Sequence, residues 1–330
     1  MTGRIIHDGP NYRVVHHRIS AAPRVVVNFE VWLPEPAREA PATATEFFVA
    51  RGINFIGIKP AVNDWFQHDE ILAAISAIRE ATPGAQRVGY GGSMGAFAAI
   101  NFAEALALDS LVAVCPQFSI QRHRVPFEHR WQQEAARIDF RHDAIDRIAP
   151  LRHGYILYDP FSEDRAHVQA ITARHPALTL VPIPFAGHEQ LRFLTHAGLA
   201  GDLLIGLVEG RFDQAAMVRR MRAARSASNL IWLGAARLLL QRRQAAAALR
   251  AILRAKAAPL PDPWLGDVTH AEILRLLGRE AEARSLVSRR LVHPALGAAA
   301  RWQLAQWAPA VAAFRPAPRP RWRRLVSWRH

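Results

Sequence analysis

A serine between glycines is the residue of this chain whose type and spacing most clearly indicate chemistry. Ser93 lies in the sequence GGSMG at residues 91–95, which fits the pattern G-x-S-x-G. The apolar run at 87–90 and the small residues at 96–100 predict a strand, a sharp turn and a helix around it. Such a turn needs glycine two positions before and after the serine, because no side chain fits there. We therefore expect Ser93 to be a nucleophile.

A nucleophilic serine needs a base and an acid, because a free hydroxyl is a poor nucleophile at neutral pH. His188 follows a predicted strand at 178–183 in a Gly-His turn. Loops at the carboxyl ends of strands carry the chemistry of doubly wound sheets, so we expect His188 to be the base. A second predicted strand, 154–158, runs into a loop with three carboxylates. Asp164 is the preferred acid, Glu163 is a further alternative, and Asp159 is an alternative that is also suited to hold the loop.

On these residues, positions 13–200 resemble an α/β-hydrolase-fold protein. The resemblance implies acyl-transfer chemistry on an ester, thioester or amide. It also implies an oxyanion hole made by the backbone N–H of Met94 and a second N–H after an early strand, here residues 24–31. That strand lacks the His-Gly or Gly-Gly dipeptide common in lipases. The second donor is expected at Phe29, with Glu30 as the alternative.

Apolar strand-like runs alternate with helical patterns in the rest of this region, which predicts a doubly wound, mostly parallel sheet. Further strands are expected at 12–19, 53–58 and 110–114, and helices at 46–51, 69–81 and 166–173. The loop after the 53–58 strand holds Asn63 and Trp65, which we expect to bind substrate. The alternative is structural: Trp65 and Phe66 pack on the next helix, and Asn63 or Asp64 caps it.

Residues 116–153 form an insertion where related folds often carry a short lid. Its basic residues either grip an acidic substrate or lie on a solvated helix face, and we favour the second interpretation. They are Arg122, Arg124, Arg130, Arg137, His123, His129 and His142. No pair of His or Cys residues has metal-ligand spacing, so we expect neither a metal site nor a cofactor.

Length and charge divide the chain into parts. With 330 residues and 50% hydrophobic content, we expect two domains: a hydrolase domain at 1–205 and a helical domain at 206–310. Residues 1–200 carry 19 basic and 20 acidic side chains, whereas residues 201–330 carry 23 and 8. Only two lysines occur in the chain, and an arginine excess beside many alanines is typical of GC-rich genomes. Nucleic acid is therefore not an expected partner.

The predicted helical domain shows weak self-similarity, because residues 239–249 align with 276–286 at an offset of 37. Its pattern resembles tetratricopeptide-type hairpins, which suggests a protein partner at these helices; a plain helical cap is the alternative. Residues 311–330 mix Arg, Trp and Pro, which favours a disordered tail, with contact to an anionic membrane surface as the functional alternative. The single cysteine, Cys115, excludes an internal disulfide, and no leader or membrane span is evident, so we expect a cytoplasmic location.

The sequence thus predicts a serine esterase that cleaves an acyl ester through Ser93, His188 and Asp164. The substrate is expected to be a small molecule, or an acyl group linked to a glycan or lipid. Acyl transfer by the same residues is the near alternative. A non-catalytic interaction module that acts through the C-terminal helices is the alternative from another class.

Overall fold

The computed structural model describes residues 3–143, 150–188, 190–225, 228–260 and 263–291. Contacts divide the described chain into two compact units. Unit 1 draws on residues 1–32, 36–183 and 187–218; unit 2 draws on 33–35, 184–186 and the described residues from 219 onward. The boundary expected at residue 205 falls inside helix α7 (Ala200–Val208).

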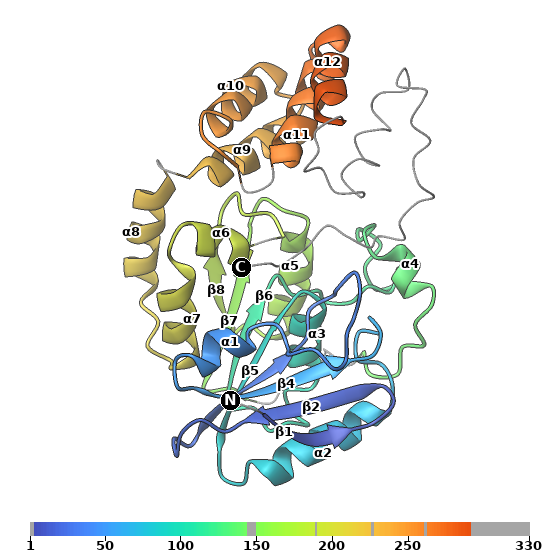
Figure 1. Cartoon of the computed structure of the whole chain (residues 1–330), viewed down its shortest axis with the longest axis vertical. Coiled ribbons are helices and arrows are strands. Elements are labelled where there is room, and N and C mark those ends of the chain that lie inside the picture. Colours follow the sequence, from blue (N-terminus) through green and yellow to red (C-terminus); the bar gives the residue numbers. More distant parts are fainter. Residues whose placement is uncertain (1–2, 144–149, 189, 226–227, 261–262, 292–330) are drawn as a thin grey trace. The chain divides into compact units, whose positions relative to one another are not determined.

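Unit 1 is built on one eight-stranded sheet with the order β1-β2-β4-β3-β5-β6-β7-β8 (Figure 1). Its strands are β1 (Arg4–Asp8), β2 (Tyr12–His17), β3 (Arg24–Phe29), β4 (Asn54–Pro60), β5 (Gln86–Gly92), β6 (Ser110–Val114), β7 (His153–Tyr158) and β8 (Thr179–Pro182). β2 pairs antiparallel with β1 and β4, and every other pair is parallel. The predicted mostly parallel, doubly wound sheet is confirmed.

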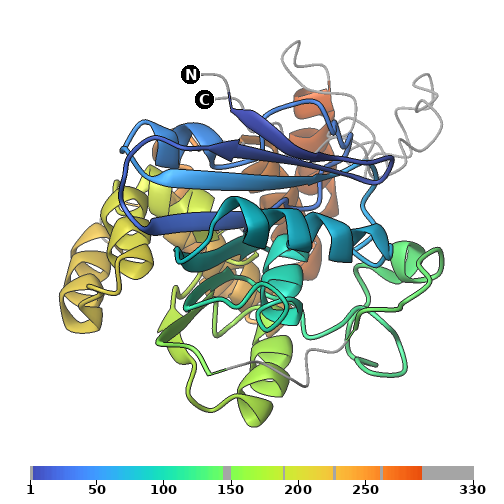
Figure 2. The same ribbon diagram turned by 90° about the horizontal axis from the view of Figure 1, so that it is seen from below.

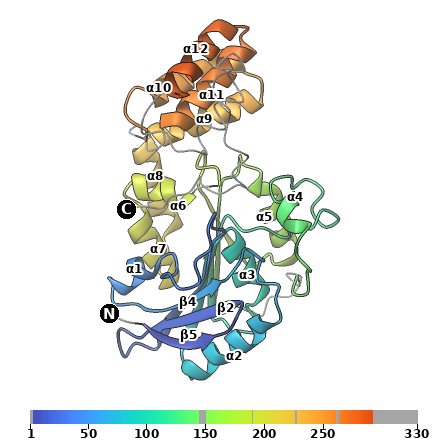
Figure 3. The same cartoon turned by 45° about the vertical axis from the view of Figure 1, so that its right-hand side comes forward.

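Helices cover both faces of this sheet (Figures 2 and 3). The helices of unit 1 and of the boundary are α1 (Thr45–Val49), α2 (Glu70–Ala81), α3 (Met94–Asn101), α4 (Gln132–Ala135), α5 (Asp164–Arg174), α6 (Gln190–His196), α7 and α8 (Gln214–Arg225). α2, α3 and α5 contribute to one apolar cluster on one face of the sheet. α1 lies on the opposite face, where Phe48 stacks on Phe55 and meets the edge of Tyr90.

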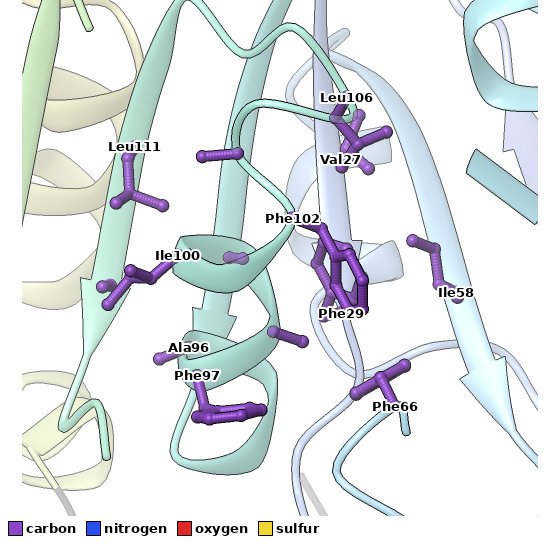
Figure 4. Close-up of a cluster of buried hydrophobic side chains, with 14 of the residues drawn as sticks. Val27, Phe29, Ile58, Phe66, Ala96, Phe97, Ile100, Phe102, Leu106 and Leu111 are labelled. Atoms are coloured by element: carbon purple, nitrogen blue, oxygen red, sulfur yellow. The ribbon is translucent and has the colours of Figure 1, made fainter. Parts of the chain in front are cut away.

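The main core of unit 1 lies between the sheet and α3 (Figure 4). Phe29 at the end of β3 stacks on Phe102 at a centroid distance of 6.0 Å and meets the edge of Phe66 at 5.1 Å. All eight residues of α3 except Asn101 are buried, because this helix is enclosed by the sheet and its neighbours. Burial on all sides explains why α3 is made of small and apolar residues, and it fixes the start of the helix in space.

Unit 2 is mainly helical in its described part, apart from the short segments 33–35 and 184–186. Its helices include α9 (Asn229–Gln241), α10 (Ala245–Ala255), α11 (Pro263–Leu276) and α12 (Glu280–Leu291). α9 packs against α10, and α11 packs against α12. The short turn within each helix pair lies inside one of the two aligned segments, 239–249 and 276–286. The tetratricopeptide comparison itself stays a prediction. The predicted basic tail, 311–330, lies outside the described residues.

Candidate active site

Ser93 occupies a strained turn between β5 and α3. Its φ of 51° and ψ of −117° lie in a region that side-chain-bearing residues rarely adopt. The neighbouring backbone is very close: a Cβ on Gly91 would lie 2.3 Å from the Gly95 carbonyl oxygen, and a Cβ on Gly95 would lie 2.2 Å from the Phe29 carbonyl oxygen. Both glycines are therefore required sterically, as the sequence pattern predicts.

The structure brings Ser93, His188 and Asp164 together from three separate elements. Ser93 Oγ lies 2.9 Å from His188 Nε2, and His188 Nδ1 lies 2.8 Å from Asp164 Oδ2. Asp164 is the first residue of α5 and is fully buried, whereas the His188 side chain is 30% exposed. Because a carboxylate only accepts, Nδ1 carries the proton in this arrangement and Nε2 is left to accept from the serine hydroxyl.

The electrostatic surroundings of Asp164 and His188 favour an ionised carboxylate and a protonated imidazole. Burial raises the pKa of Asp164, but His188 and Arg130 together lower it below its ordinary value. Burial lowers the pKa of His188, but the Asp164 carboxylate and Cys115 raise it well above its usual range. The carboxylate thus stays ionised, and an imidazolium beside it is stabilised.

Asp159, the alternative acid, is turned toward the loop that carries His188. Its carboxylate accepts the Gly187 N–H at 2.8 Å and the Phe161 N–H at 2.9 Å. Asp159 is buried, and Gly187 has a φ of 63°, in the left-handed region that favours glycine. Asp159 therefore ties the end of β7 to the residue before His188, which is the loop-holding role that the sequence left open for it. The remaining alternative, Glu163, has a mostly exposed side chain and pairs with Arg130.

The sequence did not point to a buried ionic network behind the acid. Arg130 donates to Asp164 Oδ1 at 2.8 Å and to Glu128 Oε2 at 2.6 Å. His167 accepts the Phe118 N–H at its Nδ1, so its Nε2 carries the proton and donates to Glu128 at 2.8 Å. Burial raises the pKa of Glu128, but hydrogen bonds from His167 and Arg130 hold it far below its usual range. Only the arginine richness of the insertion hinted at this network.

In the described part of the insertion, the expected helix face is not found, although Arg122, His123, His129 and Arg137 are exposed to solvent. The only helix there is the short α4, and Arg130 instead joins the triad-like cluster. Arg130 Nη1 also lies 3.4 Å from His188 Nδ1. Because Nδ1 donates to Asp164, this approach brings two donors together rather than making a hydrogen bond. Arg130 is therefore placed to oppose protonation of His188.

The loop with Asn63 and Trp65 lies beside the same serine. Trp65 is fully buried, and its indole N–H donates to Gln117 Oε1 at 3.0 Å. Gln117 in turn donates to Ser93 Oγ at 3.3 Å. Trp65 therefore reaches the site through Gln117, and a substrate contact of the half-buried Asn63 stays a prediction. The proposed helix cap is not seen, because α2 begins at Glu70 without a side-chain cap.

The neighbourhood of the expected oxyanion hole is well defined. Met94 is the first residue of α3, so its N–H has no acceptor within the helix. Phe29 is paired with Ile58 on one side and Gly91 on the other, inside the sheet. The Glu30 N–H donates to Ile58 O at 3.2 Å, so this alternative donor is already used.

Among the described residues, no group of three or more His, Cys, Asp or Glu side chains is arranged to hold a metal ion. The described helices include none with the length and apolar character to cross a membrane.

The strand order, the antiparallel second strand and the turn at Ser93 fit the α/β-hydrolase fold. No protein-family model and no curated protein matches the chain.

Several solved structures align with about three fifths of the chain at low identity. A capsule O-acetyltransferase of Neisseria meningitidis serogroup A is 10% identical, with a TM-score of 0.46, over 61% of this chain and 92% of that one. An α/β serine hydrolase without lid from Xanthomonas campestris is 19% identical, with a TM-score of 0.39, over 62% and 90%. A Pyrococcus furiosus esterase is 13% identical, with a TM-score of 0.42, over 60% and 88%.

Proposed function

We propose that this protein is a serine hydrolase that cleaves an acyl ester through an acyl-enzyme intermediate. One observation carries the proposal: Ser93 Oγ lies 2.9 Å from His188 Nε2, and Nδ1 of the same ring lies 2.8 Å from the buried Asp164 carboxylate. A nucleophile, a base and an orienting acid in hydrogen-bond contact are what acyl transfer by serine requires.

In this mechanism His188 Nε2 removes the Ser93 hydroxyl proton as Oγ bonds to the acyl carbon. The carbonyl oxygen becomes an oxyanion, which accepts the Met94 N–H. When the intermediate collapses, His188 gives its proton to the leaving alkoxide, and the acyl group remains on Ser93. In the second half of the reaction, His188 takes a proton from water as the water oxygen attacks the acyl carbon. The carboxylic acid then departs, and His188 returns the proton to Ser93 Oγ. Asp164 stays ionised throughout and stabilises the imidazolium.

The first experiment is labelling with a fluorophosphonate probe, which reacts with activated serines. The wild-type protein is expected to be labelled, and Ser93→Ala and His188→Ala are expected to lose labelling and hydrolysis of p-nitrophenyl acetate by several orders of magnitude. Ser119→Ala is the matched control, because Ser119 is also a buried serine but donates to Asp143 instead of a histidine. Labelling that persists in Ser93→Ala would overturn the proposal, and a folded wild type without labelling would favour the interaction-module alternative.

The same acyl-enzyme can pass its acyl group to an alcohol instead of water. Glycerol or a soluble glycan added to the p-nitrophenyl acetate reaction separates the two outcomes. Acetylated alcohol as the main product at millimolar acceptor would assign an acyltransferase, whereas free acetate would assign a hydrolase.

A further inference from the structure

Gln117 is a fully buried amide whose hydrogen bonds lead to the nucleophile. It follows β6 by three residues, and no part of its surface is exposed. Its Nε2 donates to Ser93 Oγ at 3.3 Å, and its Oε1 accepts the Trp65 indole N–H at 3.0 Å. A buried amide is unfavourable unless it is hydrogen-bonded, so both ends of this side chain are fixed by specific partners.

The orientation of the amide follows from its partners. Nitrogen and oxygen of a glutamine amide are distinguished by their hydrogen bonds, and an indole N–H can only donate. Oε1 must therefore face Trp65, which leaves the NH₂ group directed at Ser93. A flipped amide would place two donors against each other and turn an acceptor toward the nucleophile.

The loop that holds Trp65 is itself tightly constrained. Trp65 and Phe66 have φ values of 50° and 58°, a left-handed conformation that bulky residues rarely adopt. Gln67 Nε2 donates to the Trp65 carbonyl at 2.9 Å, and the Phe66 N–H donates to Asp64 Oδ1 at 2.9 Å. Such strain persists only where the surroundings fix it, and it is concentrated at functional sites.

The first two backbone donors after β3 are already occupied. The Glu30 N–H donates to Ile58 O, and the Val31 N–H donates to the Glu30 carboxylate at 3.0 Å. The Glu30 carboxylate is held there by Lys59 at 2.8 Å and by the Thr43 N–H at 3.0 Å. This loop therefore does not present a free N–H at Glu30 or Val31 for a second oxyanion contact.

We propose that the Gln117 side-chain amide is the second oxyanion donor, beside the Met94 N–H. The inference rests on the proposed function. In the tetrahedral intermediate the oxyanion and Ser93 Oγ are bonded to the same carbon, so a donor beside Oγ is also near the oxyanion. The new oxygen carries the negative charge and Oγ becomes ether-like, so the N–H donor binds more strongly in the transition state than in the free enzyme.

The test compares Gln117→Ala and Gln117→Glu with wild type in steady-state hydrolysis of p-nitrophenyl acetate. Loss of one oxyanion donor is expected to lower kcat about 10²- to 10³-fold, with KM changed by less than about threefold. Gln117→Glu keeps the acceptor for Trp65 but sets a negative oxygen toward the oxyanion, so it should lose more kcat than Gln117→Ala. Gln121→Ala is the matched control, because Gln121 lies in the same segment but donates to Asp143.

A boronic acid that forms a tetrahedral adduct on Ser93 provides the second readout. Its affinity should fall by the same factor as kcat/KM in both Gln117 variants, because it mimics the transition state. Unchanged kcat and boronate affinity in a folded Gln117→Ala protein would overturn the inference, as would equal activity of the Ala and Glu variants. Failure of the proposed function itself would be recognised separately, because the wild type would then show no fluorophosphonate labelling.

Discussion

Gly95→Ala tests whether close backbone contact, rather than helix propensity, determines the residue at this position. Gly95 lies in the first turn of α3, where propensity alone favours alanine by up to about 1 kcal/mol. A Cβ at this position would lie 2.2 Å from Phe29 O and 2.9 Å from Glu30 O. Both atoms belong to the backbone at the end of β3, so the clash can be removed only if α3 and β3 move apart by about 1 Å. Such a separation has the energetic cost of overpacking a core.

The expected result combines a stability and an activity effect. Overpacking of this kind is destabilising by about 1–3 kcal/mol, which outweighs the gain in propensity, and each kcal/mol lowers Tm by about 2–4 °C in a unit of this size. A displacement of about 1 Å at the start of α3 moves Ser93 and the Met94 N–H, so kcat/KM should fall about 10²-fold. Thermal unfolding followed by circular dichroism and p-nitrophenyl acetate hydrolysis measure the two effects.

Gly206→Ala is the matched control. Gly206 also lies in a helix, α7, but its Cβ would have its nearest neighbour at 3.7 Å, an ordinary contact. This variant should be as stable as wild type, or more stable by up to about 1 kcal/mol, with unchanged activity. If Gly95→Ala behaves like Gly206→Ala, the steric argument for the turn at Ser93 is refuted.

Three further predictions concern charged side chains around the site. Arg130→Gln removes a cation that opposes protonation of His188, so the pKa of His188 should rise and the low-pH loss of kcat/KM should begin at a higher pH; an unshifted pH profile would contradict this. Lys59→Met leaves the buried Glu30 carboxylate without its cation and should lower the free energy of unfolding by about 3–5 kcal/mol in urea titration, and a loss under 1 kcal/mol would argue against a stabilising role for the pair. Asp159→Ala should lower kcat/KM about tenfold by releasing the His188 loop, whereas Asp159→Asn can still accept the Gly187 N–H through its single amide oxygen and should keep more activity; equal losses would indicate that the second accepted hydrogen bond or the negative charge matters instead.

Most of the sheet could be predicted from local pattern. Strands buried on both faces have continuous apolar runs, and β6 was predicted with both ends as observed, at Ser110 and Val114. β1 was not predicted, because it is a five-residue edge strand whose residues are exposed or half-buried. Its conformation depends on pairing with β2, which no local pattern specifies.

The sequence also indicated the kind of chemistry that we propose for the site. The spacing of Gly91, Ser93 and Gly95 follows from steric limits within a few residues of the chain, so it is visible without a structure. The choice between Asp159 and Asp164 was left open, because both follow the same strand and differ only in where their carboxylates point. In the structure, Asp164 contacts His188 Nδ1, whereas Asp159 accepts the Gly187 N–H.

The contributions of Arg130 and Gln117 were decided by tertiary structure alone. Arg130 meets Asp164 across 34 residues of sequence, and Gln117 meets Ser93 across 24 and Trp65 across 52. Nothing in the local sequence distinguishes them from other arginines and glutamines of the insertion. A hydrogen bond depends on position within a few tenths of an ångström, and only the packing of sheet, helix and loop sets such distances between distant residues. The sequence by itself therefore determined the turn that holds Ser93, the proposed nucleophile, and the tertiary structure decided which side chains surround it.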